Sequence, residues 1–144
     1  MILLFLNLLK LYFMHKGFLI TGSLLAALAV ALGAFGAHGL KKIVPADTIS
    51  TFETGVRYQF YHCFALILVA ILFEKFPGSW MSYAGYSFIA GILLFSGSLY
   101  ILTLIKATGT VGLNGIGIVT PFGGLFLIAG WILMAFAFFK SGRI

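Results

Sequence analysis

GFLITGSLLAALAVALGAFGA, residues 17–37, contains no charged side chain and is long enough to cross a bilayer as a helix, which takes about 20 apolar residues. Small residues recur within it at four-residue spacing, at Gly22 and Ala26 and again from Ala29 to Ala37. This spacing lets helix backbones approach closely in lipid. The stretch is therefore predicted to be a transmembrane helix that packs inside the protein.

Three more apolar segments follow in a chain that is 62% hydrophobic and only 8% charged. The second begins amphipathic at Asp47 and is continuously apolar over residues 63–73; the third covers residues 83–105. The fourth begins near Ile118 or Pro121 and ends at Phe139. The predicted fold class is an all-α membrane protein, a single domain over residues 14–144, with a bundle of four transmembrane helices. The second helix is expected to start in the membrane interface.

Residues 1–13, MILLFLNLLKLYF, are apolar but too short to span a membrane, and they include Asn7 and Lys10. They lack the basic start and small-residue cleavage site of a signal peptide. Two alternatives remain open: a helix lying in the interface, or an extension ahead of a natural start at Met14.

The net charge of +6 comes from basic residues at the ends of the apolar runs. Lys and Arg at these positions contact lipid head groups, so nucleic acid is excluded as a partner and membrane lipid is expected as one. Basic residues are divided almost equally between the two sides of the predicted topology. The orientation in the membrane therefore stays undecided.

FETGVRYQFYH, residues 52–62, is the densest polar segment of the chain. At helical spacing Glu53 can pair with Arg57, and Tyr58 can face His62. Four crossings place this segment on the same side as the end of the first span and the start of the fourth. The candidate residues for ligand binding or for a polar brace are His38, Glu53, Arg57, Tyr58, Gln59, His62 and Asn114.

Two interpretations of these residues remain open. As a structural brace they would satisfy one another, with Glu53 lowering the cost of Arg57 near lipid. As a functional site they would line a polar cavity for a lipid head group, a quinone-like molecule or a proton. The brace is preferred, because ionisable groups near the ends of spans commonly serve as interfacial anchors.

Other chemistry is disfavoured by the residue pattern. His38 and His62 lack the spacing of a metal site, so neither a metal nor a cofactor is expected. Cys63 and its neighbour His62 point in different directions on a helix, which argues against nucleophilic catalysis. Proton-coupled export needs an ionisable group deep in the bundle, and the central parts of the spans contain no acidic or basic residue.

Four stretches resemble a known family: LGAFGAHGL at 32–40, ETGVRYQFYH at 53–62, GILLFSGSLY at 91–100, and TPFGG with a following GW at 120–131. The chain is similar to the YgdD/YwdK-like family of four-span bacterial proteins, which has mitochondrial relatives in eukaryotes. The resemblance implies a multi-pass protein of the bacterial inner membrane. It implies no activity and no catalytic residue.

The function expected from these observations is non-enzymatic. The leading hypothesis is an accessory or packing partner of a membrane assembly or of lipid. It depends on the small-residue helix faces and on the lack of a catalytic constellation. The alternative is a carrier or binding protein for a small hydrophobic or weakly polar molecule. A membrane-protein partner or a homo-oligomer is compatible with either hypothesis.

Overall fold

The computed structural model describes residues 14–109 and 114–141, with Asn114 described by its backbone alone. Every regular element of the described residues is a helix or a helical turn, and they contain no strand. The predicted extension at residues 1–13 lies outside them. The elements in chain order are α2 (Lys16–His38), the 3-10 turn η1 (Leu40–Lys42), α3 (Ala46–Leu72), α4 (Ser79–Gly91), the π-helical turn η2 (Ile92–Ser96), α5 (Gly97–Thr108), η3 (Asn114–Ile118) and α6 (Val119–Lys140).

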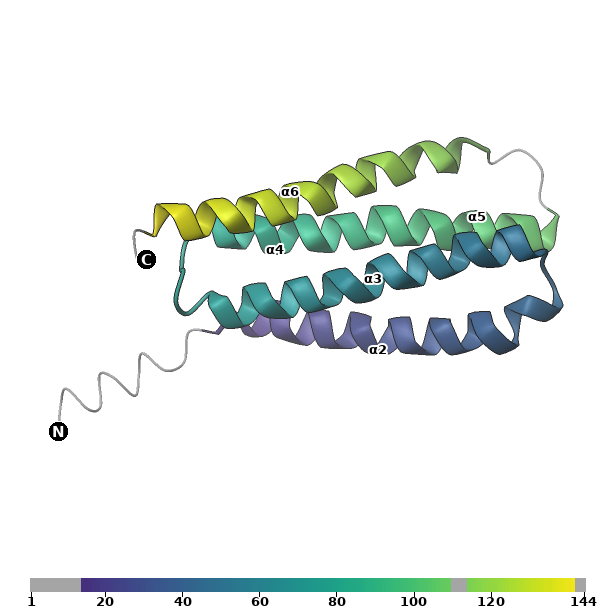
Figure 1. Ribbon diagram of the computed structural model, residues 1–144, viewed down its shortest axis with the longest axis horizontal. Helices are drawn as coiled ribbons and strands as arrows, with labels where there is room; N and C mark the ends of the chain where they lie inside the picture. Colours follow the sequence, from purple (N-terminus) through teal and green to yellow (C-terminus); the bar gives the residue numbers. More distant parts are fainter. Residues whose placement is uncertain (1–13, 110–113, 142–144) are drawn as a thin grey trace.

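Four helices are long and apolar enough to cross a membrane, which confirms the predicted fold class. They are Lys16–Lys42, Ala46–Leu72, Ser79–Thr108 and Gly115–Lys140. The third of them consists of α4, η2 and α5, which continue one another along a single axis (Figure 1). The second begins directly after Pro45, whose fixed φ and missing N–H suit a helix start.

The four crossing helices form an open row in the order α2, α3, α4 with α5, and α6 (Figure 1). The helix α2 packs mainly on α3, and α6 packs mainly on α4 and η2. The start of α2 and the end of α6 lie at the same end of the row. Both flanks of the row therefore face the surrounding lipid. The prediction that the first span packs inside the protein is wrong, because α2 is an outer helix that packs mainly on α3 alone.

Small residues of α2 are what bring it close to α3, as their spacing predicts. A Cβ added to Gly22 would lie 2.9 Å from Ile67 Cγ1 and 3.2 Å from the Cys63 carbonyl oxygen. A Cβ on Gly36 would lie 3.0 Å from the Phe52 ring. Gly22 and Gly36 are thus taken up by packing within the chain, whereas Gly33 is half-buried and Ala37 is exposed.

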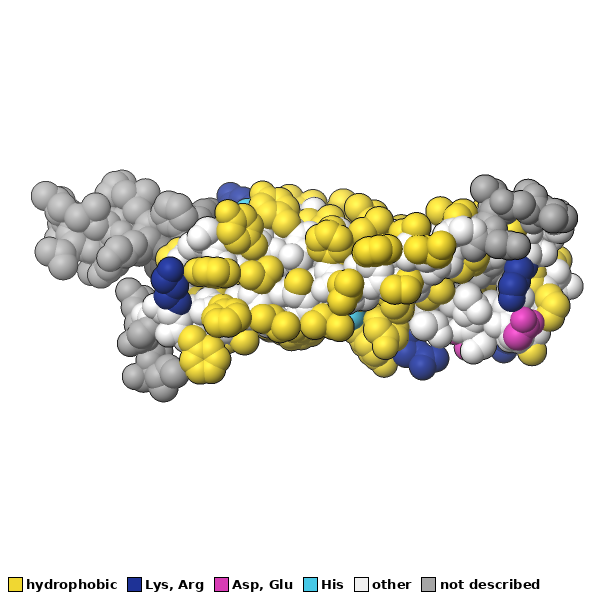
Figure 2. All heavy atoms as spheres, turned by 90° about the horizontal axis from the view of Figure 1, so that it is seen from above, with side chains coloured by type: hydrophobic (Ala, Val, Ile, Leu, Met, Phe, Trp, Pro, Cys, Tyr) yellow, Lys and Arg dark blue, Asp and Glu magenta, His cyan; other side chains and the backbone are white. Residues whose placement is uncertain are grey.

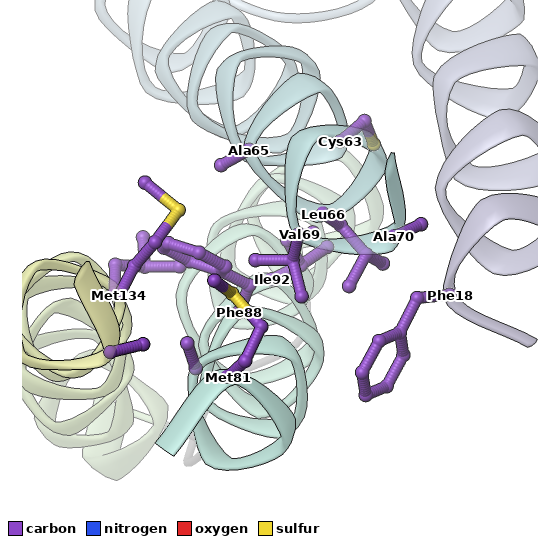
Figure 3. Packing of buried hydrophobic residues seen from close by; sticks show 13 residues of the cluster. Phe18, Cys63, Ala65, Leu66, Val69, Ala70, Met81, Phe88, Ile92 and Met134 are labelled. Carbon is purple, nitrogen blue, oxygen red and sulfur yellow. The ribbon is translucent and has the colours of Figure 1, made fainter. Parts of the chain in front are cut away.

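The main hydrophobic core lies where α3, α4 and α6 meet, as Figure 3 shows. Phe88, Leu66, Met81 and Val69 are fully buried there, with Phe18 of α2 at its edge. This core sits in the half of the molecule that contains the two termini of the described chain. The polar groups of α3 are concentrated beyond it, toward the opposite end.

Figure 2 shows hydrophobic side chains along the middle of the molecule and most of the charged side chains toward its two ends. This is the surface expected of a protein that spans a bilayer, with apolar side chains in the hydrocarbon region and basic residues at the head groups. Aromatic residues of the α4 start, among them Trp80 and Tyr83, are exposed at one end, at the level of an interfacial belt.

Candidate functional site

Gln59 is the most completely engaged polar residue of α3. Its side chain is 2% exposed. Gln59 Nε2 donates to the Leu25 carbonyl oxygen over 2.8 Å, and Gln59 Oε1 accepts from the Tyr100 hydroxyl over 2.8 Å. One amide therefore links α3 to α2 on one side and to α5 on the other. Gly55, one turn earlier, leaves the space in which the Tyr100 ring lies.

His62 is held at both ring nitrogens. Trp131 Nε1 donates to His62 Nε2 over 3.3 Å, and His62 Nδ1 lies 2.7 Å from the Tyr58 carbonyl oxygen. An indole N–H only donates and a carbonyl only accepts, so the two contacts together assign the ring proton to Nδ1. His62 is therefore a neutral tautomer whose two nitrogens are both occupied. The Tyr58 ring stacks on it at 6.0 Å between centroids.

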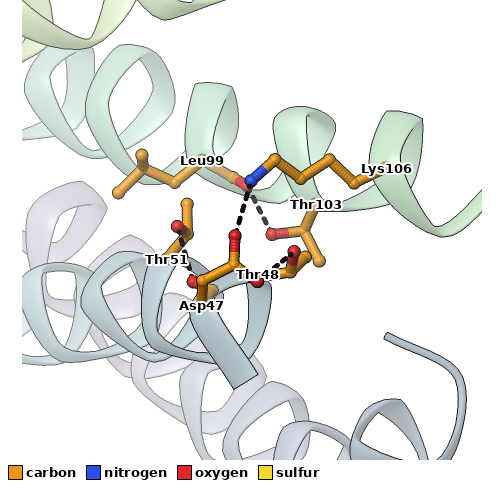
Figure 4. A network of polar contacts seen from close by, with 6 residues as sticks. All are labelled: Asp47, Thr48, Thr51, Leu99, Thr103 and Lys106. Carbon is orange, nitrogen blue, oxygen red and sulfur yellow. Dashed lines mark hydrogen bonds and ion pairs between the residues drawn. The ribbon is translucent and has the colours of Figure 1, made fainter. Parts of the chain in front are cut away.

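Polar contacts also join the third span to α6 and to the start of α3. Ser98 Oγ lies 2.7 Å from Thr120 Oγ1 and donates to the Phe95 carbonyl oxygen. At the end of the bundle, Lys106 Nζ lies 3.3 Å from Asp47 Oδ2. Figure 4 shows this exposed pair beside the hydroxyl contacts of the neighbouring threonines. The pair places the start of α3 level with the end of α5.

Glu53 and Arg57 lie on a different face of α3 from Gln59. Both are exposed, and neither forms a hydrogen bond or ion pair with any described residue. The predicted ion pair between them is therefore not formed in the structure. Within residues 14–109 and 115–141, Asp47 and Lys106 make the one ion pair present.

The two charges line a groove of about 410 Å³ between α2 and α3. Its floor is apolar, with small residues and Val30 on the α2 side and Val56 and aromatic rings on the α3 side. Gly33 faces Val56, with 3.6 Å between an added Cβ and Val56 Cγ1. The complete lining is Ala29, Val30, Gly33, Gly36, Phe52, Glu53, Val56, Arg57, Phe60 and Tyr61.

The position of these charges along α3 sets their depth. Arg57 follows Asp47 by ten residues, which is about 15 Å at the helical rise of 1.5 Å per residue. Glu53 follows Asp47 by six residues, about 9 Å on the same scale. Arg57 therefore starts near the middle of α3, and its long side chain must extend toward the polar end to keep its charge out of the hydrocarbon.

The structure separates the residues that the sequence places in one cluster. Tyr58 and His62 lie on the side of α3 that faces η2 and α6, and Gln59 lies beside them, between α2 and α5. Glu53 and Arg57 line the groove, and His38 is exposed at the end of α2 without contact to them. The side chain of Asn114 lies outside the described residues.

Trp131 and Asp47 are the residues that sequence reasoning missed. Trp131 contributes the donor for His62, and a tryptophan amid an apolar span is a signal for such a buried polar partner. Asp47 is the first acidic residue of α3, and Lys106 is the final basic residue of α5. Opposite charges at two helix ends on the same side could have indicated the pair.

A second hollow of about 250 Å³ lies at the opposite end of the molecule, between the α3–α4 connection and the end of α6. Lys140 lies over the Trp80 ring there, 5.7 Å from its centroid. Across the described chain, no three His, Cys, Asp or Glu side chains gather closely enough to hold a metal ion.

Comparison with known proteins places this architecture in a family. Residues 32–124 match the family model described as "Protein of unknown function (DUF423)". The chain is 43% identical to the UPF0382 membrane protein YwdK of Bacillus subtilis over 87% of this chain and 98% of that protein. It is 42% identical to the UPF0382 membrane protein SAB0533 of Staphylococcus aureus, over 87% and 97% of the two chains.

A further relative is a UPF0382 membrane protein of Haemophilus influenzae, 44% identical over 78% of this chain and 85% of that protein. No solved structure gives a significant match. The matched family segment runs from the end of α2 to the start of α6, so it includes all of α3 and α5 with their polar residues, and Trp131 lies beyond it. The chain belongs to the DUF423 family of membrane proteins of unknown function.

Proposed function

We propose that this protein is a non-enzymatic protein of the bacterial inner membrane that binds a phospholipid in the groove between α2 and α3. One observation carries the proposal. The groove has an apolar floor and two charged side chains on its wall, and neither charge has a partner among the described residues. An amphipathic molecule with acyl chains and a charged head group complements such a surface.

The depth of Arg57 supports a lipid as the occupant. An Arg at the centre of a membrane helix costs about 2.5–3.5 kcal/mol on insertion scales, and the cost falls toward the interface. A guanidinium is well matched to a phosphate, to which it donates two parallel hydrogen bonds. A phospholipid lying along the groove would bring a phosphate within reach of Arg57 and would offset this cost.

The hypothesis of an accessory or packing partner loses one of its supports. It depends on small-residue helix faces being available to another protein. Gly22, Ala29 and Gly36 of α2 are instead buried against α3. The side chains of Gln59 and His62 are likewise engaged by partners within the chain. A partner protein, or a second copy of this chain, is the competing occupant of the groove.

The test is to count bound phospholipids by native mass spectrometry after extraction in a mild detergent. Val30 lines the groove and is 61% exposed, so Val30→Trp should fill the groove without disturbing the core. We expect this variant to lose at least one phospholipid that the wild type retains. Leu28→Trp, on the same helix but outside the groove lining, is the matched control and should retain it.

Arg57→Gln should weaken the same lipid, whereas Lys41→Gln, an exposed basic residue outside the groove, should not. Equal lipid counts in the wild type and Val30→Trp would overturn the proposal. Loss of a co-purifying protein or of a dimer from Val30→Trp, in place of a lipid, would assign the groove to a protein partner.

A further inference from the structure

The two charges of the groove differ in sign and in depth, and this difference specifies the head group. Glu53 precedes Arg57 by four residues, so it lies about 6 Å nearer the start of α3 along the helix axis. The start of α3 lies at the polar end of the bundle, where Asp47 pairs with Lys106. Glu53 is therefore the outer charge and Arg57 the inner one.

A phospholipid with an ethanolamine head group carries its charges in the complementary order. Its phosphate is attached to the glycerol, next to the acyl chains, and its ammonium lies further out toward water. With the acyl chains on the apolar floor of the groove, the phosphate meets Arg57 and the ammonium meets Glu53. Both pairs join opposite charges through charge-assisted hydrogen bonds.

We infer that the groove selects a zwitterionic phospholipid whose head group carries a primary amine, with its phosphate at Arg57 and its ammonium at Glu53. This inference rests on the proposed function and adds to it the class of lipid. A glycerol head group offers Glu53 only neutral hydroxyl groups. A choline head group presents a quaternary ammonium without an N–H to donate.

Tyr61 completes the geometry of the site. It lines the groove one turn beyond Arg57, on the side of the membrane centre, and is 56% exposed. Its aromatic body fits the region where the glycerol meets the acyl chains, and its hydroxyl is able to donate to an ester carbonyl. From the polar end of the groove inward, Glu53, Arg57 and Tyr61 therefore follow the order of the ammonium, the phosphate and the ester groups of the phospholipid.

The test measures head-group preference in mixed micelles that contain equal amounts of ethanolamine, choline and glycerol phospholipids with identical acyl chains. Native mass spectrometry reports the ratio of the three lipids bound to the protein. We expect the wild type to retain the ethanolamine lipid in preference to both others. Glu53→Gln should reduce the ethanolamine-to-choline ratio about fivefold, the effect of losing one ion pair near a membrane surface, while the total lipid count is unchanged.

Asp47→Asn is the matched control, because it removes an acid of the same helix that does not line the groove. It should leave the ratio at the wild-type value. An unchanged ratio in Glu53→Gln, or a wild-type preference for the glycerol lipid, would overturn the inference while leaving the proposed function intact. Failure of Val30→Trp to remove any lipid would instead overturn the proposed function itself.

Discussion

Two faces of α3 carry polar side chains, and they differ in how those side chains are satisfied. On the face toward α5 and α6, Gln59 and His62 are buried and every polar atom of their side chains contacts a partner. On the face toward the α2 groove, Glu53 and Arg57 are exposed and form no ion pair with a described residue. The polar brace therefore corresponds to one face of α3, and the proposed binding site corresponds to another face of the same helix.

The comparison teaches that a dense polar segment in a membrane helix need not have one role. Positions 59 and 62 are three residues apart and share a face, and positions 53 and 57 are four residues apart and also share a face. The two pairs of positions point in different directions. Substitutions on the inner face should therefore change stability, and those on the groove face should change lipid binding.

The largest effect is expected from two matched glycine substitutions on α2. Gly22→Leu should destabilise the protein by about 2–3 kcal/mol, because its side chain would press on Ile67 and on the Cys63 carbonyl. Gly33→Leu should change stability by less than about 0.5 kcal/mol, because its side chain enters the open groove. Unfolding in bicelles measures both, and equal losses would show that the groove is not open.

A smaller effect is expected at the hydrogen bond between Gln59 and Tyr100. A double-mutant cycle of Gln59→Leu and Tyr100→Phe should give a coupling of about 1 kcal/mol, within the range measured for hydrogen bonds between membrane helices. Tyr61→Phe removes a hydroxyl that lines the groove, and as the control for Tyr100→Phe it should leave the free energy of unfolding unchanged. Strictly additive losses of stability in the Gln59 and Tyr100 variants would contradict the hydrogen bond between these two side chains.

The smallest effect is expected between Glu53 and Arg57 in detergent that lacks phospholipid. The sequence predicts that Arg57→Ala destabilises less when Glu53 is also replaced. The structure forms no such pair, so we now expect a coupling of about zero and additive changes. The exposed pair of Asp47 and Lys106 serves as a reference and should couple by at most about 0.5 kcal/mol, decreasing with salt. A coupling energy between Glu53 and Arg57 as large as that between Gln59 and Tyr100 would show that the groove face of α3 is also a structural brace.

The fold follows from the sequence to a large extent, because uncharged runs of bilayer length leave few alternatives to transmembrane helices. The close approach of α2 to another helix also follows, since Gly22 and Gly36 leave room for a neighbouring backbone. The π-helical turn at Ile92–Ser96 does not follow. It lies where Gly91 and Gly123 bring α6 against the third span, a tertiary contact that no local pattern encodes.

The sequence predicts which residue types the candidate site contains, but it does not predict how they are arranged. The pairing of Tyr58 with His62 follows from their four-residue spacing and is confirmed by the stacked rings. The division of the segment into two faces depends on the order of helices in the row. Nothing in residues 52–62 says that Arg57 borders a groove against α2 while His62 faces α6.

The open row has a consequence for how the chain assembles. The helices α2 and α3 form one hairpin, and the third span with α6 forms another, so most contacts link neighbours in sequence. Each hydrophobic hairpin can insert into the membrane before the two associate. The hydrophobic effect contributes little to their alignment, because lipid is as apolar as their side chains. Gln59 with Tyr100, His62 with Trp131 and Asp47 with Lys106 all bridge the two hairpins. These polar contacts set the position of the second hairpin relative to the first along the membrane normal.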